Sequence, residues 1–98
     1  MISVLVVRRF KTHGPSIEVA RVLDLPSLPL HGYQLVFEDG SGEAGVAAMR
    51  MRAWPSPRDP GVYPVAVEIR TGTEPVERLE PALLAGWTRL EFAGAGAA

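Results

Sequence analysis

The feature that most constrains this fold is a succession of strand patterns and turns between Arg21 and Arg70. Apolar and polar residues alternate there with a period of two, which is typical of half-buried β-strands. The segments are separated by turns rich in Pro and Gly. In the corner from Leu25 to Gly32, two prolines cannot donate ladder hydrogen bonds, and Gly32 restarts the chain. The pattern predicts a mainly β protein but indicates no reaction.

The first segment, residues 2–11, is rich in Val and Ile and is apolar on both faces, which predicts a central strand. Further strands are expected at 17–25, 33–37, 46–54, 62–70 and 87–92. Residues 46–54 contain Ala and Met, which also favour helix. Strict alternation favours a strand for this segment.

One helical segment is expected at residues 76–84, where the period changes. Thr73 is expected to cap it, and Pro81 is expected to break it into two short turns. An apolar stripe should dock it on the core, formed by Val76, Leu79, Leu83 and Leu84.

These elements predict a small antiparallel open barrel or roll of five or six strands, with the helical segment plugging one end. The alternative is an α+β layer in which the helix lies on an antiparallel sheet. The length of 98 residues suits one domain. We expect a single β-rich domain at 1–92 and a flexible Ala/Gly tail at 93–98.

Composition limits the class of protein. There is no cysteine, so disulfides, thiolate metal sites and a cysteine nucleophile are excluded. The N-terminus does not resemble a signal peptide, and no apolar run approaches the length of a membrane span, so a cytoplasmic location is expected. Nine Arg accompany a single lysine, Lys11, which hints at a GC-rich bacterial genome.

The corner and its flanking strands, Leu23 to Phe37, carry the pattern Leu-Pro-x-Leu-Pro-x-x-Gly. Residues 49–54, Met-Arg-Met-Arg-Ala-Trp, end a later strand in Trp54. Over roughly Val19 to Ile69 the chain resembles small uncharacterised β-barrel proteins of bacteria and phages, including those carried on mobile gene cassettes. The resemblance implies a fold and no reaction.

Few residues suggest catalysis. His13 and His31 both lie in Gly/Pro corners, where they are interpreted as turn residues. No carboxylate or second histidine stands at metal-ligand spacing, and no serine lies in a nucleophile elbow. We therefore expect a non-enzymatic protein without a metal or cofactor.

The sharpest candidate binding surface is formed by Arg50, Arg52 and Trp54 on one face of a strand. Arginine beside an aromatic ring can stack on bases or bind phosphate, and both types are favoured at protein interfaces. Arg8 and Arg9 would extend this surface if the first strand lay alongside. Ordinary solvated barrel surface is the competing interpretation.

Arg21 interrupts an otherwise apolar face, and it is expected to meet Glu38, Glu68 or water. The net charge of −1 makes electrostatic attraction to nucleic acid weak. We therefore expect a binding or assembly module that self-associates, with a protein partner as a further option. The alternative is a small-barrel protein that binds nucleic acid through the Arg50, Arg52 and Trp54 face.

Overall fold

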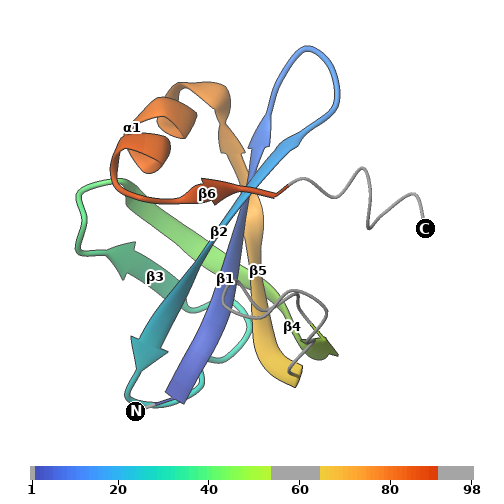
Figure 1. Ribbon diagram of the computed structural model, residues 1–98, viewed down its shortest axis with the longest axis vertical. Coiled ribbons are helices and arrows are strands. Elements are labelled where there is room, and N and C mark those ends of the chain that lie inside the picture. Colours follow the sequence, from blue (N-terminus) through green and yellow to red (C-terminus); the bar gives the residue numbers. More distant parts are fainter. Residues whose placement is uncertain (1, 54–64, 91–98) are drawn as a thin grey trace.

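A computed structural model describes residues 2–53 and 65–90. Six strands form one curled sheet in the order β3-β4-β5-β1-β2-β6, and a short helical segment covers one end (Figure 1). This half-barrel confirms the predicted mainly β fold with one short helical segment. The expected tail at 93–98 lies outside the described residues.

The centre of the sheet is β1 (Ile2–Lys11), flanked by β2 (Ile17–Leu25) and β5 (Val65–Pro75). The edges are β3 (Gln34–Phe37), which pairs with β4 (Gly42–Ala53), and β6 (Thr88–Arg89), which pairs with β2. Residues 46–53, for which a helix was the alternative to a strand, thus belong to the strand β4.

The expectation of a wholly antiparallel sheet is wrong at one pairing, because β1 and β5 run parallel. Alternation along a strand reports which face is buried but not the direction of the neighbouring strand. Parallel strands also need a long connection, and here all of β2, β3 and β4 lies between β1 and β5.

The strand registers define two faces. On the concave face, one cross-strand row runs Met49, Ile69, Val6 and Arg21, and the next runs Met51, Val67, Val4 and Leu23. On the outer face, the corresponding rows are Arg50, Glu68, Leu5 and Val22, then Ala48, Arg70, Val7 and Ala20. A register shift between Val46 and Ala48 resets the alternation of β4.

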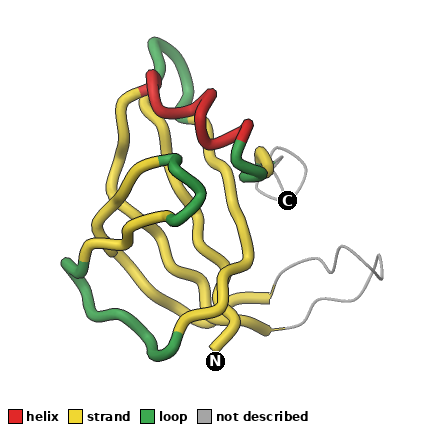
Figure 2. Tube along the Cα trace, turned by 90° about the vertical axis from the view of Figure 1, so that its left-hand side faces the viewer, coloured by secondary structure: helices red, strands yellow, loops and turns green. Residues whose placement is uncertain are grey.

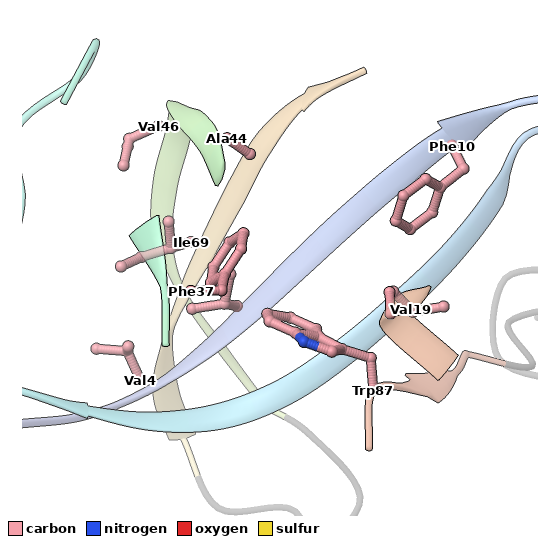
Figure 3. Close-up of a cluster of buried hydrophobic side chains, with 10 residues drawn as sticks. Val4, Phe10, Val19, Phe37, Ala44, Val46, Ile69 and Trp87 are labelled. Atoms are coloured by element: carbon pink, nitrogen blue, oxygen red, sulfur yellow. The ribbon is translucent and has the colours of Figure 1, made fainter. Parts of the chain in front are cut away.

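The hydrophobic core fills the concave face (Figure 3). Val4, Val6 and Phe10 contribute from β1, and the ring of Phe37 packs edge-to-face on Trp87 with centroids 4.9 Å apart. Burial of these side chains is the main force holding the sheet curled.

The helical segment consists of a 3₁₀ turn, η1 (Val76–Arg78), and a six-residue helix, α1 (Leu79–Leu84), which lies over the top of the half-barrel (Figure 2). Leu79 packs on the core as expected, but Ala82 is the fully buried residue. The rest of the predicted stripe is exposed, namely Val76, Leu83 and Leu84.

Two local expectations for this segment are wrong. Thr73 does not cap a helix, because β5 continues through it to Pro75 and neither helical start has a side-chain cap. Pro81 does not divide the segment, because it occupies the first turn of α1, where a missing N–H removes no hydrogen bond.

Candidate functional site

The predicted binding surface is described only in part. Arg50 projects from the outer face of β4 with 56% of its side chain exposed, and its Nε lies 3.3 Å from a carboxylate oxygen of Glu68. The side chain of Arg52 and all of Trp54 lie outside the described part of the chain, so their role stays a prediction.

The outer face carries alternating charge. Arg70 donates from Nε to Glu68 at 2.6 Å and also pairs with Glu18. Burial lowers the pKa of the Arg70 guanidinium, but hydrogen bonds and charge from Glu68 and Glu18 raise it by more. Arg50, Glu68, Arg70 and Glu18 together are neutral, so these four do not form a basic patch.

The two arginines expected to extend this surface separate. β5 lies between β1 and β4, so neither Arg8 nor Arg9 is beside Arg50. Arg9 is exposed and opposite Glu18, whereas Arg8 turns into the core with no exposed surface. The predicted extension is therefore wrong.

Arg8 is the centre of a buried polar cluster that the sequence analysis missed. Its Nε and Nη2 donate to both carboxylate oxygens of Glu74 at 2.9 and 2.7 Å, and it also donates to the hydroxyl and carbonyl of Ser41 at 2.7 and 3.0 Å. Its Cζ lies 4.4 Å from the ring centroid of Phe37 and 4.9 Å from that of Trp87. Such contacts compensate the loss of water around the cation.

A second missed feature joins the two sides of the half-barrel through Asp39. Its carboxylate accepts from Trp87 Nε1 at 2.8 Å, from Arg21 Nη1 at 3.1 Å and from the backbone N–H of Ser41 at 2.8 Å. Arg21 also donates to the carbonyl of Ala85. Of the partners expected for Arg21, neither Glu38 nor Glu68 pairs with it, and its carboxylate partner is Asp39.

Burial raises the pKa of the Asp39 carboxyl, but hydrogen bonds from Ser41 and Trp87 and the charge of Arg21 outweigh it, and the net pKa is lowered. The ionised Asp39 carboxylate therefore links the β3–β4 turn to the β2 side of the sheet.

The remaining titratable candidates do not converge. His13 and His31 are both exposed in their turns. Within residues 2–53 and 65–90, no group of three His, Cys, Asp or Glu residues could hold a metal ion. The buried Arg8 and the more exposed Asp39 are both engaged in structural contacts, and the described residues present no assembled catalytic group.

The end of the concave face that lies opposite α1 is formed by the start of β1 and the neighbouring parts of β4 and β5 (Figure 1). There its rows reach solvent through Ile2, Met49 and Met51, which are 37%, 40% and 64% exposed. Leu28, Leu30 and Tyr33 in the connection between β2 and β3 are also exposed, but the carbonyl of Tyr33 accepts from the backbone of Val46, farther along the sheet. We call Ile2, Met49 and Met51 the open apolar end.

A shallow depression of about 220 Å³ lies near the other end of the molecule, where β4 and β5 part. It is bordered by the start of β4, the end of β5, Gln34 and Arg78. Glycines on both strands, Gly45 and Gly72, keep its walls low. We call it the strand slot.

Comparison with protein-family models, curated proteins and solved structures finds no match to the chain. The resemblance to proteins of mobile gene cassettes therefore stays a prediction. None of the helices described is long and apolar enough to cross a membrane.

Proposed function

We propose that this chain is a non-enzymatic binding module that self-associates through the open apolar end. The observation that carries the proposal is the exposure of Met49 and Met51, which lie in the same rows as the buried Ile69 and Val4. A sheet face on which buried core side chains continue directly into exposed apolar side chains is typical of an interaction surface.

A second copy is the occupant that suits this surface best. The three exposed side chains of the open apolar end carry no formal charge. An uncharged apolar surface can face its own copy across a two-fold axis without like-charge repulsion. Met side chains are also enriched at interfaces, and Met51 is the most exposed residue of the open apolar end.

Charge argues against nucleic acid as the primary partner. Phosphate binding needs unpaired cations, but Arg50 and Arg70 share their charges with Glu68 and Glu18. The net charge of −1 adds no long-range attraction.

Sedimentation over a concentration series tests the proposal. The parent should increase in mass with concentration, and Met51→Glu should remain a folded monomer because a charge would be buried in the contact. Leu84→Glu is the matched control, since Leu84 is 81% exposed on α1 at the opposite end. It should associate like the parent.

A parent that stays monomeric at every concentration would overturn the proposal, as would a Met51→Glu variant that associates normally. If a monomeric parent instead shifts single-stranded oligonucleotides at low salt, and Arg52→Glu with Trp54→Ala removes the shift, the nucleic-acid alternative holds.

A further inference from the structure

The strand slot exists because β4 and β5 stop pairing before either strand ends. Their register ends at Val46 opposite Thr71. Beyond this pair, residues 42–45 of β4 pair only with β3, and Thr73, Glu74 and Pro75 pair only with β1. Two strand edges therefore face each other across the slot without a ladder between them.

Arg78 lines this slot, and the described residues accept hydrogen bonds from only part of its guanidinium. Its Nη1 donates to the carbonyl of Glu43 at 3.2 Å and lies 3.8 Å from a Glu74 oxygen. Both oxygens of Glu74 are already held by Arg8 at shorter distance. Among the residues that the structure describes, the other guanidinium N–H groups of Arg78 have no hydrogen-bond partner.

Glu43 supplies the opposite charge on the same slot. Its carboxylate forms no ion pair or hydrogen bond with any described residue, although its own carbonyl accepts from Arg78. The hydroxyl of Thr73 and the amide of Gln34 also line the slot, and neither side chain hydrogen-bonds within the described part of the chain. A cation and an anion thus line the same slot without forming an ion pair with each other.

We propose that the strand slot binds a small zwitterion of the amino-acid or dipeptide class. The ligand carboxylate pairs with Arg78, and its ammonium pairs with Glu43. A peptide group between the two ends can hydrogen-bond to the backbone edges of β4 and β5. The volume of about 220 Å³ suits a ligand below drug size. This site is independent of the open apolar end, which lies at the other end of the half-barrel.

Amide chemical shifts of the ¹⁵N-labelled full chain, titrated with glycylglycine, test the proposal. Signals of Gly45, Gly72 and Thr73 should move and saturate. N-acetylglycine lacks the ammonium and glycinamide lacks the carboxylate, so each should bind about two- to fivefold more weakly than glycine itself. Arg78→Gln and Glu43→Gln should each weaken glycylglycine binding by a similar factor, while Arg50→Gln, on the outer face, should leave it unchanged.

Three results would overturn the proposal: no saturable shift in the parent, shifts confined to residues away from the slot, or equal binding of glycine and its two blocked analogues. The analogue comparison uses the unmodified chain, and the Glu43 carboxylate forms no hydrogen bond or ion pair with a described residue. A folding defect in Arg78→Gln would therefore leave two decisive readouts.

Discussion

Arg8 and Glu74 form a bidentate ion pair inside the half-barrel, although 66 positions separate them in the chain. Their side chains are 0% and 5% exposed. The parallel pairing of β1 with β5 brings them together, since Glu74 lies opposite Phe10 in that register. The pair therefore depends on the one strand direction that differs from the expected antiparallel sheet.

Replacing Glu74 by Leu should destabilise the protein strongly. The substitution leaves the Arg8 cation buried with only Ser41 and the aromatic rings around it. Breaking a buried pair on one side costs about 3–5 kcal/mol, because an uncompensated charge remains. The shift of the urea unfolding midpoint, at unchanged slope, measures this loss.

The double variant Arg8→Met with Glu74→Leu is the control, because it removes both charges. Apolar replacement of a whole buried pair is often neutral or stabilising, so the double variant should be clearly more stable than Glu74→Leu alone. Equal midpoints for the single and double variants would contradict the prediction.

Much of the fold could be predicted because its strands are amphipathic or β-branched. The rows of β1, and of β4 from Ala48 onward, follow from the period of two, and the corner at Gly32 follows from its two prolines. The direction of β5 could not be predicted, because parallel and antiparallel neighbours impose the same alternation on β1. The length of β5 was also missed, since Thr71, Gly72 and Thr73 resemble a turn in sequence.

The site was harder to predict than the fold. Arg8 breaks the apolar face formed by Val4, Val6 and Phe10, and this signal was available in the sequence. Its partner could not be identified, because Glu74 and Ser41 reach it only through the tertiary structure. The open apolar end depends on the register shift in β4, and alternation alone gives no information about where curvature leaves Met51 uncovered.

Gly32→Val should cost about 1–3 kcal/mol in unfolding free energy. Gly32 adopts a φ of +87°, a conformation that side chains with a Cβ rarely adopt. No atom lies within 4 Å of a Cβ built there, so the loss would reflect backbone strain rather than a clash. Gly14→Val is the control, because Gly14 has the same open space without a positive φ. Equal urea midpoints for parent and Gly32→Val would contradict the prediction.

Leu79→Ala should cost about 2 kcal/mol, the lower part of the range for truncating a buried leucine, because Leu79 is only partly buried against the core. Leu84 lies on the exposed side of α1, so Leu84→Ala should change stability by less than about 0.5 kcal/mol. Thermal or urea unfolding of the two variants measures the difference. If both lose the same amount, α1 is not held by Leu79.

The protein should lose stability at acidic pH because the Asp39 carboxylate becomes protonated. The folded pKa of Asp39 is below its ordinary value of 3.8, so its contribution is complete above that value and is lost as the pH falls through the lower folded pKa. Asp39→Asn should be less stable than the parent at neutral pH, because it loses the charge that faces Arg21 and Trp87. The difference in unfolding free energy between the parent and Asp39→Asn should narrow as the pH falls below 3.8.

Urea midpoints across this pH range measure that difference. Glu38→Gln is the control, since Glu38 is exposed next to Asp39 and its carboxylate forms no hydrogen bond or ion pair with a described residue. The small difference between Glu38→Gln and the parent should not change with pH in the same way. If the difference in unfolding free energy between the parent and Asp39→Asn stays constant at every pH, the Asp39 carboxylate charge does not stabilise the fold.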